Sequence, residues 1–124
     1  MNLMTTFALL ASSLFATGVA AAQAAEPGPK GEVLFKQRCA MCHAIGGNGG
    51  KLGPDLKGVV GRKAGSAAFS YSPAMKSSKM VWSPATLEKY LAAPTRTVPG
   101  TRMVIAISKP EDRKAIIEHL ATAK

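Results

Sequence analysis

Two cysteines and a histidine stand close enough together in this sequence to share one chemical task. They form the run Cys39-Ala40-Met41-Cys42-His43, which contains both cysteines of the chain. The C-x-x-C-H spacing is a signature of covalent haem c attachment. Both thiols, about one helical turn apart, can add to the vinyl groups of one porphyrin. His43 is then placed beneath the iron and can bind it through an imidazole nitrogen.

Two other interpretations of the cysteine pair are weaker. A dithiol redox pair of the thioredoxin type is expected in a βαβ context, and the sequence has almost no strand signal. A structural zinc site needs four ligands, and the chain offers no further cysteine and one other histidine, His119. We therefore expect a haem, with the haem-free dithiol protein as a rival hypothesis.

The second axial ligand of the iron must come from elsewhere in the chain. The candidates are Met41, Met75, Met80, Met103 and His119. Met41 lies between the two thiols, so it cannot reach the far face of the haem. Met103 follows the rigid turn Pro99-Gly100 in a loop that could lie against the haem, where its thioether would favour ferrous iron. The usual role of a methionine is core packing, so these residues alone leave the ligand open.

Short helices must position these residues. Gly31, Leu34 and Phe35 have the spacing of one helix face within residues 30–42,. Ser83-Pro84 is typical of an N-cap followed by the first helical residue, with a helix to about Ala93. The run from Ser108 to Glu111 has capping-box spacing ahead of a last helix.

Long loops join the predicted helices. A glycine-rich loop starts at 46–50 and continues to about Gly65, and a second loop is predicted over 95–109. Loops of this length are unusual in a compact domain unless something orders them. We therefore expect an all-α fold of three to five short helices and long loops wrapped around one large cofactor.

The amino-terminal segment has the composition of an export signal. Its first 25 residues contain no Lys, Arg, Asp or Glu, and an apolar run ends in Ala20-Ala21-Ala22-Gln23-Ala24-Ala25. This pattern predicts a cleaved signal peptide at 1–24 and a mature domain at 25–124. A retained membrane anchor is the alternative, although polar residues make the uninterrupted apolar run short for a span.

The mature chain is strongly basic. The formal charge is +9, and between Val33 and Pro110 twelve basic residues face two acidic ones, Asp55 and Glu88. Such a surface steers association with an acidic partner, and the attraction weakens as salt rises. An exported protein meets little nucleic acid, so we do not expect a nucleic-acid partner.

From Gly31 to Leu120 the sequence resembles class I cytochrome c of the mitochondrial and bacterial periplasmic type. The resemblance rests on several motifs in the family's order. They are Gly31-Glu32-Val33-Leu34-Phe35, the attachment site, Gly53-Pro54-Asp55-Leu56, Gly61-Arg62-Lys63-Ala64-Gly65, Phe69-Ser70-Tyr71, Trp82, Thr86-Leu87-Glu88-Lys89-Tyr90-Leu91, Pro94 and Pro99-Gly100-Thr101-Arg102-Met103.

The resemblance implies a role for each matching residue. Met103 would be the sixth iron ligand, and the Pro54 carbonyl would accept the proton of the far nitrogen of His43. Tyr71 and Trp82 would donate hydrogen bonds to a haem propionate, and the charge of Arg62 would offset it. Tyr90 would lie near the Met103 sulfur and Thr101 near the inner propionate. Gly31 would allow the first and last helices to cross closely, with Phe35 and Leu120 at that contact.

Three residues depart from the family pattern without removing a primary ligand. Met75 occupies a place near the haem where many relatives carry Asn, so it would dry the pocket and bring a second thioether close to the iron. Ile105 stands where many relatives carry Phe beside the exposed haem edge. His119 stands at an often aromatic position.

The resemblance implies a monomeric periplasmic electron carrier, without a small-molecule substrate and not an enzyme. It would shuttle single electrons between respiratory or photosynthetic membrane complexes, a reductase on one side and an oxidase or reaction centre on the other. Arg38, Lys51, Arg96 and Arg102, expected near the haem edge, would dock acidic sites on them. The rival is a haem sensor or gas-binding protein with a labile sixth ligand.

Overall fold

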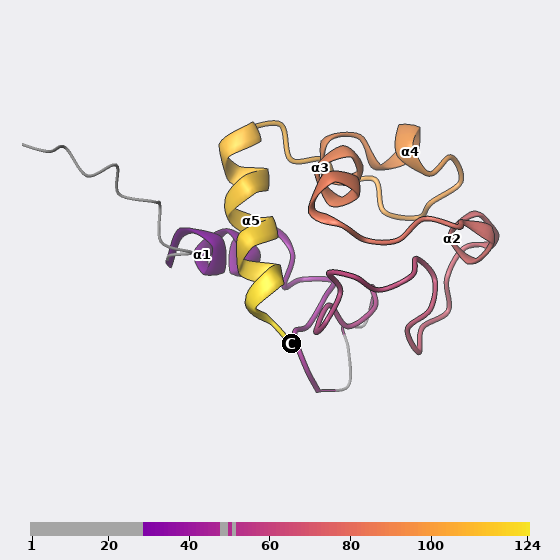
Figure 1. Ribbon diagram of the computed structural model, residues 1–124, viewed down its shortest axis with the longest axis horizontal. Coiled ribbons are helices and arrows are strands. Elements are labelled where there is room, and N and C mark those ends of the chain that lie inside the picture. Colours follow the sequence, from indigo (N-terminus) through magenta and orange to yellow (C-terminus); the bar gives the residue numbers. More distant parts are fainter. Residues whose placement is uncertain (1–28, 48–49, 51) are drawn as a thin grey trace, which may run out of the picture.

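Five short helices and the long segments between them make up the computed structural model, which describes residues 29–47, 50 and 52–124 (Figure 1). The helices are α1 (Pro29–Arg38), α2 (Pro73–Ser77), α3 (Pro84–Ala92), α4 (Pro94–Thr97) and α5 (Pro110–Thr122). Within these ranges no strand forms, and the one isolated β-bridge joins Lys63 to Val81. The prediction of an all-α fold with three to five short helices is confirmed. The predicted signal peptide, 1–24, lies outside the described residues.

Every one of these helices begins with a proline. Proline at the first helical position has its φ preset and gives up an N–H that would have no helical partner anyway. At α3 the Ser83 side chain accepts a hydrogen bond from the Thr86 N–H at 3.1 Å, and the Thr86 hydroxyl accepts one from the Ser83 N–H at 2.8 Å. The predicted start at Ser83-Pro84 is therefore confirmed, because two of the free N–H groups are satisfied by a capping box.

Other helix boundaries differ from the prediction. Helix α1 ends at Arg38, and the cysteine motif follows it in turns instead of lying within the helix. The predicted capping box at Ser108 is wrong, because the N-cap of α5 is Lys109 and no side chain caps it. The Ser108 carbonyl instead accepts a hydrogen bond from Arg113. Two short helices, α2 and α4, were not expected from the pattern.

Helices α1 and α5 cross at Gly31. A Cβ at that position would press against the carbonyl oxygen of Ala115 and lie 2.8 Å from the Cβ of His119. The missing side chain therefore lets the two backbones approach, which confirms the predicted close crossing. The ring of Phe35 packs on that of His119, with the ring centroids 5.7 Å apart.

Helix α3 packs on both α4 and α5 and supplies much of the core. Its buried residues are Leu87, Tyr90 and Leu91, and the indole of Trp82 lies 4.9 Å from the ring of Tyr90 between centroids. Figure 1 shows α2 on the side of the molecule opposite α1, with loops running between them. No described helix is long and apolar enough to cross a membrane.

Candidate functional site

The cysteine motif occupies a set of tight turns directly after α1. The N–H groups of Cys42 and His43 both donate to the Cys39 carbonyl, at 3.0 and 2.9 Å, and the Cys39 N–H donates to Phe35 at 2.8 Å. These bonds keep both thiols and the imidazole on one short, ordered piece of backbone. Both cysteines are half-buried and form no disulfide.

The protonated form of the Cys39 thiol is favoured by its surroundings. Burial raises the pKa of Cys39 to about 11, and the neighbouring Cys42 adds to the rise. A nucleophilic cysteine depends on a lowered pKa, because the thiolate is the reactive form. Cys39 is therefore held as the thiol by its surroundings.

The ring of His43 is held on two sides. Its Nδ1 lies 2.8 Å from the Pro54 carbonyl oxygen, and because a carbonyl can only accept, Nδ1 carries the proton. The other nitrogen, Nε2, is then left with a lone pair for a metal. A Cβ on Gly53 would lie 2.6 Å from Nδ1 and 2.9 Å from Nε2, so only a glycine lets the backbone lie against the imidazole.

A cavity of about 520 Å³ opens beside His43. Its size is that of a pocket for a sizeable organic ligand, roughly 300–1,000 Å³. Most of its lining is apolar and comes from α2, α3, α5 and the segments between the helices. The residues are Cys39, Cys42, His43, Leu52, Gly53, Pro54, Leu56, Val59, Arg62, Phe69, Tyr71, Ser72, Met75, Trp82, Leu87, Tyr90, Leu91, Thr101, Arg102, Met103, Val104, Ile105, Ile116 and Leu120.

This cavity fits a covalently attached haem. Both thiols and the imidazole lie on its wall, as the attachment chemistry requires,. The apolar lining suits a porphyrin face, and the few polar groups could meet the propionates, which need donors when they are buried. Every predicted site residue lines the cavity, including Pro54, Arg62, Tyr71, Trp82, Tyr90, Thr101 and Met103.

The candidates for the sixth ligand separate clearly. Met103 is half-buried and lines the cavity, and Met75 is buried at 7 % exposure and lines it too. Met41 is 84 % exposed, and neither Met80 nor His119 lines the cavity. Two of the five candidates therefore line the cavity, Met75 from α2 and Met103 from the loop after α4.

The segment before Met103 is fixed by side-chain hydrogen bonds. The hydroxyls of Tyr90 and Thr101 lie 2.7 Å apart, and the Arg102 guanidinium donates to the Ser70 carbonyl at 2.9 Å. Burial raises the pKa of the Tyr90 phenol, and the hydrogen bond with Thr101 partly opposes that rise. Tyr90 thus serves as a neutral anchor for the loop at ordinary pH.

The residues expected near the propionates have partners of their own. The Arg62 guanidinium donates to the carbonyls of Asp55 at 2.7 Å and Lys57 at 3.1 Å. The Tyr71 hydroxyl accepts from the Ala67 N–H at 3.2 Å, which leaves its own proton available. Trp82 is buried at 7 % exposure, and none of the described residues forms a hydrogen bond with its indole N–H.

The structure adds Leu52, Gly53 and Val104, to which the sequence interpretation gave no role, and it places Ile105 at the cavity, where the resemblance implied an exposed haem edge. Gly53 touches the imidazole, and its signal was only its place before Pro54. Leu52 and Val104 line the cavity while each being 71 % exposed, and Ile105 does so at 48 %. These three residues, which we name the apolar rim, form an exposed hydrophobic edge that a pattern of short apolar runs did not reveal.

Comparisons with known proteins agree with the site. Residues 29–124 match the family model described as Cytochrome c. The chain is 48 % identical over 106 residues to cytochrome c2 of Rhodomicrobium vannielii, covering 83 % of this chain and 84 % of that protein. It is 47 % identical over 96 residues to a cytochrome c of Theileria annulata, covering 76 % and 84 %. Among solved structures, cytochrome cH from Methylobacterium extorquens matches with a TM-score of 0.69 and 44 % identity, over 75 % of this chain and 95 % of that one.

Proposed function

Because the chain belongs to the cytochrome c family and binds haem c covalently through Cys39 and Cys42, we propose that it is a periplasmic one-electron carrier with iron held by His43 and Met103. It would connect membrane-bound respiratory or photosynthetic complexes, with residues 1–24 acting as the cleaved export signal and 25–124 as the carrier domain. One observation carries the proposal, namely a single apolar cavity lined by both thiols, His43 and Met103.

The held imidazole supports His43 as the first axial ligand. The Pro54 carbonyl accepts the Nδ1 proton at 2.8 Å, so Nε2 keeps its lone pair. A histidine whose second nitrogen donates to a carbonyl has a fixed tautomer and is a more basic ligand. The adjacent Gly53 backbone limits rotation of the ring.

Loop anchoring supports Met103 as the second ligand. The Thr101–Tyr90 and Arg102–Ser70 hydrogen bonds lie one or two residues before Met103 and hold its backbone at the cavity. Bound haem supplies an iron that takes up and releases one electron. Protein ligands at both axial positions would leave little to rearrange during transfer and no position for a substrate, which is why we propose a carrier instead of an enzyme.

The polar residues of the lining would meet the propionates. The available hydroxyl proton of Tyr71 and the indole N–H of Trp82 are suited to donate to buried carboxylates. Arg62 is oriented by two backbone carbonyls and would bring positive charge to the same side. Thr101 already bonds to Tyr90, so its share in this group would be smaller.

The apolar rim supports docking at the cavity mouth. Leu52, Val104 and Ile105 offer hydrophobic contact beside the haem, while Arg38, Arg96 and Arg102 are exposed cations. Lys51, expected in the same group, lies outside the described residues. Cationic groups would speed encounter with acidic sites on membrane-bound partners, and a small apolar contact would let the monomeric carrier leave again.

The optical spectrum of the oxidised holoprotein tests the proposal. Ferric iron bound to a thioether has a weak charge-transfer band in the far red, and we expect it in the wild type. Met103→Leu should abolish the band and let the ferrous protein take up carbon monoxide. Met75→Leu removes the other thioether of the cavity at similar volume and should keep the band.

Two outcomes would overturn the proposal. A band that survives Met103→Leu but disappears in Met75→Leu would show that Met75, and not Met103, is the sixth ligand. A wild-type protein that has no such band and binds carbon monoxide readily would be a haem sensor or gas-binding protein.

A further inference from the structure

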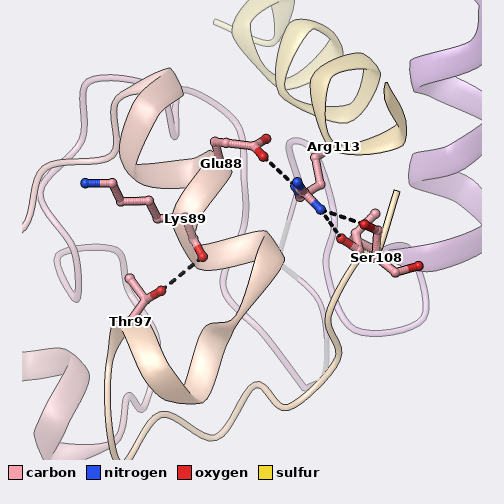
Figure 2. Close-up of polar contacts among 6 residues, drawn as sticks. Glu88, Lys89, Thr97, Ser108 and Arg113 are labelled. Carbon is pink, nitrogen blue, oxygen red and sulfur yellow. Dashed lines mark hydrogen bonds and ion pairs between the residues drawn. The ribbon is translucent and has the colours of Figure 1, made fainter. Parts of the chain in front are cut away.

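Arg113 joins three parts of the chain at the start of α5. Its Nε donates to a carboxylate oxygen of Glu88 on α3 at 2.6 Å. One terminal nitrogen of its guanidinium lies 2.8 Å from the Ile107 carbonyl oxygen and 2.9 Å from that of Ser108. Figure 2 shows the Arg113 side chain between α3 and the backbone that leads into α5. We name this group, Glu88, Arg113 and the two carbonyls, the arginine clamp.

The position of this cation is explained by the clamp and not by its own helix. Arg113 lies in the first turns of α5, where the helix dipole is positive and disfavours a cation. Its side chain is nevertheless only 11 % exposed. A buried guanidinium needs a carboxylate and further acceptors to offset its lost hydration. Glu88 and the two carbonyls supply them, so the group is a specific arrangement.

The clamp holds the exit of the segment that carries Met103. Four residues after Met103, the Ile107 N–H donates to the Leu91 carbonyl on α3 at 2.8 Å, and the Ile107 carbonyl accepts from Arg113. Between Met103 and Ile107, the residues Val104, Ile105 and Ala106 are exposed. Within the described residues, no hydrogen bond from the backbone of those three to another group is found. Contacts before Met103 and the clamp after it therefore hold the segment.

Helix α3 contacts both the cavity and the group that holds the segment after Met103. Leu87, Tyr90 and Leu91 of α3 line the cavity, while Glu88, on the same helix, holds Arg113. A displacement of residues 107–108 away from α3 would move the end of the short, exposed stretch that follows Met103.

We propose that Arg113, oriented by Glu88, is a positioning residue that keeps Met103 at the iron by holding the exit of its loop against α3. The inference rests on the proposed function, in which Met103 is the sixth ligand. In this role the clamp sets the small fraction of protein in which the loop has opened and an external ligand can take the position of Met103.

Imidazole binding to the ferric holoprotein measures that fraction. The ligand competes only when Met103 has left, so its apparent affinity is proportional to the open fraction. Arg113→Lys keeps the charge but loses the planar fork that reaches the carboxylate and the carbonyls together. We expect about tenfold tighter apparent binding, which corresponds to about 1.4 kcal/mol, and a smaller rise of about threefold for Glu88→Gln, whose amide oxygen can still accept from Nε.

The matched control is an ion pair on α5, the helix that carries Arg113. Glu118 pairs with Lys114 one turn away on α5, and Glu118→Gln makes the same chemical change without touching the loop. It should leave imidazole affinity unchanged. Denaturant unfolding of each variant, followed by far-ultraviolet circular dichroism, separates a local opening from a general loss of stability.

The results distinguish this inference from the proposed function. A wild type without the far-red band, or one that binds imidazole without losing it, overturns the assignment of Met103. A wild type with the band, together with unchanged imidazole affinity in Arg113→Lys, overturns the clamp, even where the unfolding midpoint falls. An equal effect of Glu118→Gln also overturns it. Should Arg113→Lys fail to fold, Glu88→Gln decides by the same criteria.

Discussion

The two sides of the cavity are built in different ways. On the His43 side the positioning contacts come from nearby chain, with hydrogen bonds to the Cys39 carbonyl and the Pro54 carbonyl. On the Met103 side the Tyr90–Thr101 bond spans the same 11 positions as His43–Pro54, but the other contacts come from farther away, since Arg102 reaches Ser70 across 32 positions and Arg113 reaches Glu88 across 25. One side is therefore specified locally, while the other exists only once the helices have packed.

This difference predicts which ligand can leave. A local turn that is tied to the haem by two covalent bonds keeps its histidine in place even when tertiary packing loosens. A loop held by a few long-range hydrogen bonds, each contributing about 1 kcal/mol, and by one iron–thioether bond has no covalent link to the haem and opens more easily. The Met103 side should thus be the one that responds to mutation, pH and added ligands.

The largest expected effect breaks the His43 side with a single methyl group. In Gly53→Ala the new Cβ would overlap the imidazole ring, and since the ring cannot move freely, we expect a loss of about 3 kcal/mol in unfolding free energy. Denaturant unfolding of the holoprotein measures it, and the optical spectrum reports the ring. Gly61→Ala is the control, because its φ of +91° is strained but nothing lies within 4 Å of a Cβ there, and it should cost about 1 kcal/mol.

A smaller effect concerns alkaline pH and the Met103 side. Burial raises the pKa of Tyr90 above its usual 10.0, so the folded protein holds the phenol proton where the unfolded chain releases it. The contribution of this proton to the unfolding free energy is complete below pH 10 and is lost as pH rises through the pKa of Tyr90 in the folded protein. Over that range the unfolding free energy falls by up to about 1.4 kcal/mol per pH unit. Tyr90→Phe should therefore lose less stability than the wild type between pH 10 and 12 in denaturant titrations.

Tyr71 provides the comparison for this pH experiment. Tyr71→Phe removes a phenol from the same cavity but leaves the Tyr90–Thr101 contact in place. It should keep the alkaline loss of the wild type. Equal alkaline behaviour of the wild type and Tyr90→Phe would refute the linkage.

The smallest expected effect lies at the entrance of the Met103 loop. The Thr97 hydroxyl is 2.8 Å from the Ala93 carbonyl and 3.0 Å from that of Lys89, a contact that Figure 2 also shows. Thr97→Val loses this bond and should lower the unfolding free energy by about 0.5–1 kcal/mol and slightly tighten imidazole binding. Thr95→Val, at an exposed position of the same short helix, should change neither quantity.

Much of the fold was predictable where a local rule applies. Ser83-Pro84 started a helix as expected, because an N-cap and a proline at the first position act within one turn,. Gly31 predicted the close crossing of α1 and α5 through the resemblance to cytochrome c. The Ser108 prediction failed because the N-cap of α5 is Lys109, so the Ser108 hydroxyl stands one residue before the capping position.

The residues of the candidate site also fall into two groups, those predicted from a local motif and those identified only in the folded chain. Cys39, Cys42, His43 and Pro54 came from a motif and its resemblance, and the cavity brings them together. For the sixth ligand the sequence excluded Met41 and left four candidates open, Met75, Met80, Met103 and His119, and only the folded chain shows that Met75 and Met103 line the cavity. Of the apolar rim, the resemblance implied Ile105 alone. Leu52 and Val104 could not be predicted, because exposure beside a cavity depends on which segments surround it.

The attachment of haem at Cys39 and Cys42 follows from residue types and spacing, because covalent chemistry over five consecutive residues needs no distant partner. No motif of neighbouring residues specifies the opposite wall of the cavity, which carries Met103. Glu88 and Arg113 meet only when α3 and α5 have packed, and Arg102 meets Ser70 only when the segment before α2 lies beside the Met103 loop. Hydrogen bonds and burial depend on distances in space, and those distances are decided by the tertiary structure.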